Sequence, residues 1–198
     1  MKLGLMGGTF DPIHFGHLFI AEEARVRCEL DEVWFVPNRT PAHIQGKAAH
    51  LSPLERFEMC ELAVANNPHF RASRVEIERV GKSYAFDTIQ EVRAQTNAEI
   101  FWILGADAMG EVLSWHRGAP LFEHCHFIAA SRPGFSLADA KNGLNAFQGS
   151  RVEWMEVPGL HIASRDLRQR IQLRQPIRYL VPDAVRERIE ERGHYLHP

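Results

Sequence analysis

The sequence predicts an α/β fold: a Rossmann-like, doubly wound parallel sheet with helices on both faces. Three observations predict it. Short runs of β-branched and aromatic residues alternate with helix-periodic segments along the 198 residues. No internal repeat or low-complexity run interrupts this alternation. Expected strands end at turn residues, as at Gly7-Gly8 and Pro37-Asn38. Strand–helix–strand units of this kind cross over right-handed and build a parallel sheet that helices cover on both faces.

The individual elements follow from these patterns. Strands are expected at residues 2–6, 32–36, 75–77, 100–104, 127–130 and 152–157, and helices at 18–29, 53–65, 84–95, 165–173 and 182–192. The helix from residue 53 has the clearest start. Ser52 is its expected N-cap, Pro53 stands at its first position, and Glu55 completes a capping box. The length fits one domain over residues 1–198, with a short helical C-terminal portion over about 162–198.

Composition and charge exclude several classes of protein. The chain is 45% hydrophobic and 24% charged with a formal net charge of -2, which is ordinary for a globular protein and argues against a nucleic-acid or membrane partner. No apolar run approaches the ~20 residues of a membrane helix, and the N-terminal run is too short for a signal peptide. Cys28, Cys60 and Cys125 are widely spaced, so we expect reduced, buried thiols and a cytoplasmic protein. A homo-oligomer is compatible with this composition, and no sequence pattern indicates an oligomeric state.

The segment GGTFDPIHFGHL, residues 7–18, follows the first expected strand and leads into a helix. Gly7 and Gly8 carry no Cβ, so the backbone can turn sharply and come close to a ligand. Thr9 adds a hydroxyl and a backbone N–H. The N–H groups at the start of the following helix are unpaired and lie at its positive dipole end, which predicts an anion site.

His14 and His17 fall at this helix start. Their imidazoles can donate hydrogen bonds to phosphate oxygens, and as His⁺ they would offset charge that builds up during phosphoryl chemistry. The pair could instead ligate zinc, but no obvious third and fourth ligands accompany it. The segment is neither a Walker A loop, since no Gly-Lys-Ser/Thr follows, nor a GxGxxG fingerprint.

A second phosphate element is expected at HIASRDLRQRI, residues 161–171. Ser164 is a candidate N-cap, and the amides of Arg165 and Asp166 would point outward at the helix start. Arg168 lies one turn on and shares a face with Ser164. A helix start with Ser and Arg can hold a triphosphate. The alternative is a capped amphipathic helix with solvated arginines.

The first segment resembles the nucleotidylyltransferase superfamily, whose GxFDPxHxGH signature includes the HxGH motif, here His14-Phe15-Gly16-His17. The resemblance implies that the two histidines bind the phosphates of ATP and stabilise the transition state without a covalent intermediate. The superfamily's second motif is often ISSTxxR. Ile162, Ser164 and Arg168 match it, whereas Ala163 and Arg165 replace a Ser and a Thr, so hydroxyl roles at those two positions are not implied.

Four middle segments resemble bacterial nicotinate-nucleotide adenylyltransferases: VPNRTPAH (36–43), SYAFDT (83–88), LGAD (104–107) and Trp115. With both terminal motifs, the resemblance spans about residues 1–192. It implies transfer of AMP from ATP to nicotinate mononucleotide, giving nicotinate adenine dinucleotide (deamido-NAD) and pyrophosphate, in NAD biosynthesis. Alternative acceptors are nicotinamide mononucleotide and 4′-phosphopantetheine. Alternatives of another class are a silent nucleotide sensor and a small zinc-binding interaction module.

The resemblance implies catalytic roles for His14, His17 and Arg168. It implies ATP or phosphate contacts for Gly8, Thr9, Phe10, Gly105, Asp107, Arg132, Ile162 and Ser164, and acceptor contacts for Asn38, Tyr84, Ala85 and Trp115.

The chemistry of these side chains suits such ligands. Trp115 offers a flat face to a pyridine ring, and Asp107 can accept from ribose hydroxyls. Tyr84 and the Ala85 amide stand at a helix start that suits a nicotinate carboxylate, and Asn38 could hydrogen-bond the same end. The alternatives are a core or surface Trp115, Asp107 as N-cap of a helix over 108–113, and Asn38 as a turn residue.

The expected cofactor is Mg²⁺, bound mainly through ATP, because the sequence offers no carboxylate cluster for it. The acceptor phosphate is already anionic and needs no general base, so catalysis is expected to rest on positioning and charge stabilisation. His124 and His126 flank Cys125, but their alternation suggests the edge of a strand rather than a metal site. The tail RERIEERGHYLHP carries no readable function.

Overall fold

A computed structural model describes residues 1–41, 49–131, 141, 144–158 and 160–197. Its internal contacts divide the chain into two compact units that alternate along the sequence. Unit 1 comprises Met1–Gly7, Ile20–Trp34 and Tyr84–Gly159, and unit 2 comprises Gly8–Phe19, Phe35–Ser83 and Leu160–Pro198. None of the helices in the described ranges has the length and apolar character of a membrane-spanning helix.

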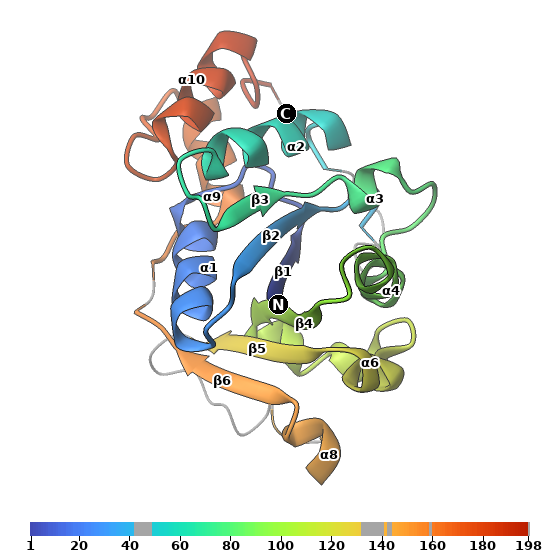
Figure 1. Ribbon diagram of the computed structural model, residues 1–198. Helices are drawn as coiled ribbons and strands as arrows, with labels where there is room; N and C mark the ends of the chain where they lie inside the picture. The colour runs from blue at the N-terminus through green and yellow to red at the C-terminus, as the bar shows by residue number, and fades with distance from the viewer. Residues whose placement is uncertain (42–48, 132–140, 142–143, 159, 198) are drawn as a thin grey trace. The chain divides into compact units, whose positions relative to one another are not determined.

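Six strands form one sheet, in the order β3-β2-β1-β4-β5-β6 (Figure 1). They are β1 (Lys2–Gly8), β2 (Glu32–Pro37), β3 (Phe70–Ala72), β4 (Glu99–Gly105), β5 (His126–Ser131) and β6 (Val152–Glu156). The pairs β1–β4, β4–β5 and β5–β6 are parallel. Chain order reverses between β1 and β4, as in doubly wound folds, where ligands bind beyond the carboxyl ends of strands at such a reversal. The predicted fold class is confirmed.

Unit 1 is built around the parallel strands β4, β5 and β6 and most of β1. The register places Leu5 beside Trp102 and Ile103 beside Ile128. All four of these side chains are buried, as continuous apolar strands are when both faces of a sheet are covered. A Cβ on Gly7 would lie 2.6 Å from the Trp102 ring, so glycine is required at this point of β1. The helical segments of unit 1 are α4 (Ala85–Thr96), α5 (Ala106–Met109), the 3₁₀ helix η1 (Val112–Ser114), α6 (Gly118–His124) and α8 (Ala146–Gly149).

Unit 2 contains β3, α2 (Pro53–Val64), α3 (Val75–Glu78), α9 (Ser164–Gln172) and α10 (Asp183–Arg192), while α1 (Phe15–Arg27) begins in this unit and continues into unit 1. The capping box predicted for α2 is confirmed: the Ser52 hydroxyl accepts from the Glu55 N–H, and the Glu55 carboxylate accepts from the Ser52 N–H. Arg188 of α10 pairs with Glu58 of α2 at 2.6 Å, which joins the two helices.

Two element predictions were wrong. Residues 75–77 form helix α3 rather than a strand, and the strand is β3, three residues long and too short to show an alternating pattern. The β-branched Val75 and Ile77 suggested a strand, but Glu76 between them is buried and pairs with Arg79 one helical turn on. The helix expected at 108–113 is split into α5 and η1. Helices α6 and α8 were not predicted.

All three cysteines carry free thiols, as predicted. Cys60 and Cys125 are buried, whereas Cys28 is only half-buried, so the expectation of burial fails there. Burial raises the pKa of the Cys125 thiol to about 12. A thiol that stays protonated in this way is chemically inert at neutral pH.

Candidate functional site

The loop from Gly8 to His14 leaves the end of β1 and enters α1, as the sequence predicted. Several of its carbonyl groups accept hydrogen bonds from the protein itself. The Gly8 carbonyl accepts from the Asn38 N–H at 3.0 Å. The Thr9 carbonyl accepts from Arg56 Nη1 at 2.6 Å. Because each of these oxygens accepts a hydrogen bond, it repels an anion less than a free carbonyl would. Phe10 has φ 49° and is buried, with its ring edge-on to His17 at 5.0 Å.

His14 and His17 are stacked, with ring centroids 3.7 Å apart and planes inclined by 22°. His17 Nδ1 accepts from the His14 N–H at 3.3 Å, so a neutral His17 carries its proton on Nε2 and can donate from there. A Cβ on Gly16 would lie 3.0 Å from the His14 ring. The glycine of the HxGH motif therefore makes room for this ring.

Both imidazoles are neutral at neutral pH in the ligand-free protein. Desolvation lowers the pKa of His14 to about 4. Desolvation, and secondly the charge of His14, lowers the pKa of His17 well below its ordinary value of 6.5. In this ligand-free form the rings therefore offer neutral N–H donors, and a role as His⁺ during phosphoryl chemistry stays a prediction. His14 Nδ1 is buried and has no hydrogen-bond partner within the described residues. A buried polar atom of this kind calls for a partner that a ligand can supply.

The second phosphate element begins at Ser164, the first residue of α9. Its N-cap is Ala163, so the N-cap prediction for Ser164 was wrong. The Asp166 N–H donates to the Ala163 carbonyl at 3.0 Å, so the prediction that this amide is directed outward was also wrong. Ser164 and Arg168 do share a face of α9. The Ser164 hydroxyl donates to the Pro12 carbonyl at 2.8 Å, and Arg168 Nη1 donates to the Asp11 carbonyl at 2.6 Å.

These bonds bring the two predicted phosphate elements together within unit 2. The Ile162 carbonyl also belongs here, 3.7 Å from the position of a Cβ on Gly16. In this ligand-free form the Ser164 hydroxyl donates its hydrogen bond to the Pro12 carbonyl of the loop. Arg168 is half-buried and uses one N–H group for the bond to Asp11, and a guanidinium has five.

Asn38 follows β2 and holds the loop in place. Its amide Nδ2 donates to Thr9 Oγ1 at 3.1 Å, and its Oδ1 accepts from Arg56 Nη1 at 3.3 Å. Both ends of the amide therefore have partners inside the protein. A contact between Asn38 and the acceptor substrate stays a prediction. In the ligand-free structure Asn38 stabilises the loop by hydrogen bonds to Thr9 and Arg56. Because Thr9 Oγ1 accepts from Asn38, the Thr9 hydroxyl proton is left to donate elsewhere.

Sequence reasoning missed Arg56, whose side chain is 0% exposed. It donates to Thr9 and Asn38 and, through Nε, to the Leu51 carbonyl at 3.3 Å. A signal was present in the sequence. Arg56 lies on the face of α2 that Met59, Cys60 and Val64 bury, and an arginine in such an apolar stripe must find internal acceptors.

Unit 1 holds the other predicted site residues. Tyr84 is the N-cap of α4 and Ala85 its first residue, as the sequence predicted to within one residue. The Tyr84 ring lies 4.3 Å from the His116 ring, a neighbour that sequence reasoning did not consider. Trp115 follows η1 and is half-buried. Their contacts with an acceptor remain predictions.

Gly105 is the N-cap of α5, so the alternative of Asp107 as N-cap of a helix over 108–113 was wrong. The exposed Asp107 folds its carboxylate onto Gly105, where a Cβ would collide with it. A side chain at position 105 would therefore displace this carboxylate from its present place. Arg132 lies outside the described residues.

His124, Cys125 and His126 do not form a metal site. His124 ends α6 rather than lying in a strand, and its Nδ1 is 2.9 Å from Arg93 Nη1. His126 Nε2 is 2.8 Å from Arg151 Nη1. The described ranges contain no group of three or more His, Cys, Asp or Glu residues that could hold a metal ion. Each of these two histidines thus has a ring nitrogen beside an arginine.

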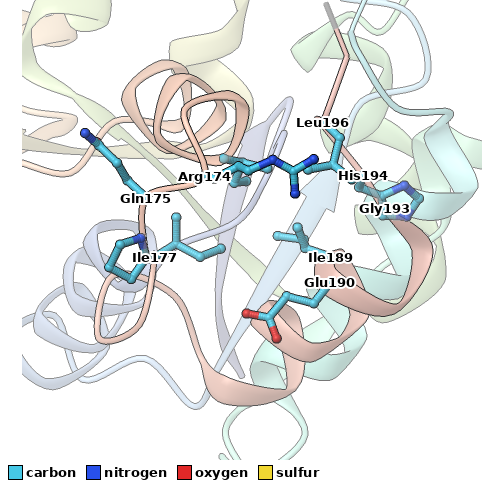
Figure 2. Close-up of a pocket in the computed structure, with 10 residues that line it drawn as sticks. Arg174, Gln175, Ile177, Ile189, Glu190, Gly193, His194 and Leu196 are labelled. Carbon is cyan, nitrogen blue, oxygen red and sulfur yellow. The ribbon is translucent and has the colours of Figure 1, made fainter.

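A cavity of about 410 Å³ lies in the C-terminal part of unit 2. It is lined by the end of α9, by α10 and by the residues after each helix, including Ile177, Ile189, His194 and Leu196 (Figure 2). The predicted site residues do not line it. The cavity and the HxGH loop are therefore separate features of this unit.

Comparison with known proteins places these features in a family context. Residues 5–171 match the family model described as cytidylyltransferase-like. A Moorella thermoacetica protein named probable nicotinate-nucleotide adenylyltransferase is 45% identical over 200 residues, covering 98% of this chain and 91% of that protein. An Exiguobacterium sibiricum protein of the same name is 43% identical over 192 residues, covering 96% and 97%. A solved structure of Plasmodium falciparum nicotinic acid mononucleotide adenylyltransferase, complexed with NaAD, has a TM-score of 0.78 at 17% identity, covering 100% of this chain and 98% of that chain. At that identity the likeness concerns the fold.

Proposed function

The chain belongs to the cytidylyltransferase-like family, and from that premise we propose that it transfers the AMP unit of ATP to nicotinate mononucleotide. The products are nicotinate adenine dinucleotide and pyrophosphate. The observation that carries the proposal is the identity of 42–45% over nearly the whole chain to relatives named for this activity. The stacked, neutral histidine pair on a loop with engaged carbonyls supports it. Three free thiols and a net charge of -2 fit a cytoplasmic enzyme without a nucleic-acid partner.

In this reaction a phosphate oxygen of nicotinate mononucleotide attacks the α-phosphorus of ATP. A new P–O bond forms, and the bond from the α-phosphorus to the bridging oxygen breaks, so that pyrophosphate leaves with the electron pair. The attacking oxygen is already anionic, so no proton has to be removed. The protein's contribution is positioning and charge stabilisation.

Several residues of unit 2 can position the phosphates of ATP and stabilise their charge. The free Thr9 hydroxyl proton, the Nε2–H of His17 and the unpartnered ring nitrogen of His14 supply polar groups for the α-phosphate region. We assign the departing pyrophosphate to the remaining N–H groups of Arg168 and to the backbone at the start of α9. Donors fixed in a desolvated site stabilise developing charge more strongly than water does.

We propose that Mg²⁺ enters bound to ATP. The described residues offer no cluster of ligands for a resident ion, and the Asp11 carboxylate of the loop is already hydrogen-bonded. When bound, the ion would neutralise part of the triphosphate charge. The chain's own residues then need only to orient the phosphates.

For the acceptor, we assign the pyridine ring to Trp115 and the nicotinate carboxylate to the helix start at Tyr84 and Ala85. Backbone N–H groups at a helix start supply donors only and carry a partial positive charge. They suit both oxygens of a carboxylate. A carboxamide would turn its own N–H₂ toward a donor and leave both groups unpaired, at a cost of ~1–3 kcal/mol.

An acceptor panel with ATP and Mg²⁺, followed by pyrophosphate release, tests the proposal. We expect kcat/KM for nicotinate mononucleotide to exceed that for nicotinamide mononucleotide by at least ~10-fold, because each 1.4 kcal/mol corresponds to one decade. We expect no turnover of 4′-phosphopantetheine. Trp115→Ala should weaken both mononucleotides and leave their ratio unchanged, since the indole contacts only the ring. Equal efficiency, or a preference for the amide, would show that the acceptor assignment is wrong.

A further inference from the structure

We propose that Tyr195, in the C-terminal tail, is a positioning residue for this reaction: its hydroxyl acts through the Asp11 carboxylate to fix the loop that carries the two histidines. The inference rests on the proposed function for its readout, but its evidence is the geometry of unit 2. Sequence reasoning assigned no function to this tail and none to Asp11.

Asp11 is the centre of this arrangement, and it is only 4% exposed. Its Oδ1 accepts from the Tyr195 hydroxyl at 2.7 Å. Its Oδ2 accepts from the His50 N–H at 2.7 Å, and His50 Nδ1 lies 3.4 Å from the same oxygen. A buried carboxylate needs donors of this kind. Both oxygens are used inside the protein, so Asp11 serves the loop rather than a ligand.

The backbone of Asp11 is held from the same part of the chain. Its carbonyl accepts from Arg168, and the next carbonyl, that of Pro12, accepts from Ser164. The Phe15 N–H donates to the Leu180 carbonyl at 3.1 Å. The C-terminal portion thus holds the segment from Asp11 to Phe15 by four hydrogen bonds, and His14 lies within that segment.

The tail is shaped to deliver the Tyr195 hydroxyl. Gly193 ends α10 with φ 63°, and Tyr195 itself has φ 64°. A left-handed conformation is uncommon for a residue with a Cβ and persists where the surroundings hold it. His194 and Leu196 line the C-terminal cavity (Figure 2), whereas Tyr195 is 5% exposed and reaches Asp11.

The charges around the pair keep the tyrosine protonated. Burial raises the pKa of Tyr195, and the Asp11 carboxylate raises it further, while Arg168 and Arg56 oppose them. The hydroxyl is therefore a permanent donor. Without it, Asp11 Oδ1 would be buried and short of a donor, and the loop would shift to find one. His14 follows three residues later, and a displacement of about 1 Å at reacting groups can cost on the order of 100-fold in rate.

Tyr195→Phe removes the hydroxyl and leaves the ring. With ATP, Mg²⁺ and whichever acceptor of the panel the wild type uses best, we expect kcat to fall by about 10-fold or more and the KM for that acceptor to change by less than about twofold. The matched control is Tyr179→Phe, in the same C-terminal portion and 81% exposed, which should leave both constants unchanged. Each protein is assayed well below its own melting temperature, so that loss of folded protein does not contribute.

The second measurement is a double-mutant cycle with Asp11→Asn, which keeps the shape of the side chain and removes its charge. If Tyr195 acts through Asp11, the two losses in kcat are not multiplicative, and Tyr195→Phe has a smaller effect in the Asp11→Asn protein. An unchanged kcat in Tyr195→Phe, or fully multiplicative losses, would overturn the inference. If the wild type turns over another acceptor but not nicotinate mononucleotide, the proposed function is wrong. The Tyr195 inference can then still be tested with that other acceptor, so failure of the proposed function and failure of the inference can be told apart.

Discussion

Replacing Arg56 with methionine should destabilise the protein by about 3–5 kcal/mol. The side chain is fully buried and makes two short bonds of 2.6 Å, to the Thr9 and Asn38 carbonyls. Two longer bonds of 3.3 Å reach Asn38 Oδ1 and the Leu51 carbonyl. Methionine fills the space of the stem but leaves all four oxygens without this donor.

The magnitude follows from these contacts. A hydrogen bond to a charged group contributes about 1.5–3 kcal/mol, so the two short bonds together are worth roughly 3–6 kcal/mol. An opposing effect reduces the loss: desolvation lowers the pKa of Arg56, which means that burying the charge is itself unfavourable. Arg56→Lys keeps the charge but has no planar fork to serve both carbonyls, so its loss should be intermediate.

Urea unfolding followed by far-UV circular dichroism measures this, with an unchanged m-value as the sign that the same transition is observed. Arg188→Met is the matched control, because Arg188 also bonds α2 but pairs with Glu58 at the half-exposed surface. It should cost less than about 1 kcal/mol. If Arg56→Met lies within about 1 kcal/mol of the wild type, Arg56 does not hold the loop as described, since losses of several kcal/mol mark buried networks of this kind.

Two further predictions concern the histidines. His17→Ala should lower kcat by ~100-fold or more, as expected on losing a donor that stabilises transition-state charge, and normal turnover by the folded variant would contradict the proposed chemistry. The second concerns acid. Because the pKa of His14 is about 4 in the fold against 6.5 ordinarily, the unfolded chain binds the proton first as pH falls. This histidine's contribution to stability is present above pH 6.5 and is lost toward pH 4, by up to about 3 kcal/mol. The free energy of unfolding in urea should fall less between pH 7 and pH 4.5 for His14→Gln than for the wild type. An equal fall in both proteins would rule out a neutral, buried His14.

Local chemistry was readable from the sequence. Ser52, Pro53 and Glu55 predicted the start of α2 to the residue. The shared face of Ser164 and Arg168 followed from their spacing of four. Each of these depends on residues that are neighbours along the chain. The turn expected at Gly7-Gly8 was wrong, because both glycines belong to β1 and the chain turns at Asp11-Pro12.

The sequence-based predictions failed where the structure depends on contacts between residues far apart in the sequence. Asp11 is 184 residues from Tyr195, and Arg56 is 47 residues from Thr9, so no local pattern could show these bonds. The charge state of the histidines in the ligand-free protein depends on desolvation by the folded chain, which spacing does not report. Residues 75–77 were misread because a buried Glu76, paired with Arg79, stabilises a helical turn despite its β-branched neighbours.

The ties between the first loop and the last residues also have a consequence for biosynthesis. A ribosome makes the Asp11–Pro12 segment early, yet its partners Ser164, Arg168 and Tyr195 are added 152, 157 and 184 residues later. N-terminal parts of a chain fold first during translation, but this loop cannot take its final form until the C-terminal helices have emerged. A nascent chain could therefore bury much of its sheet while its phosphate loop is still incomplete. Competence to bind nucleotide would then arise only after Ser164, Arg168 and Tyr195 have been added.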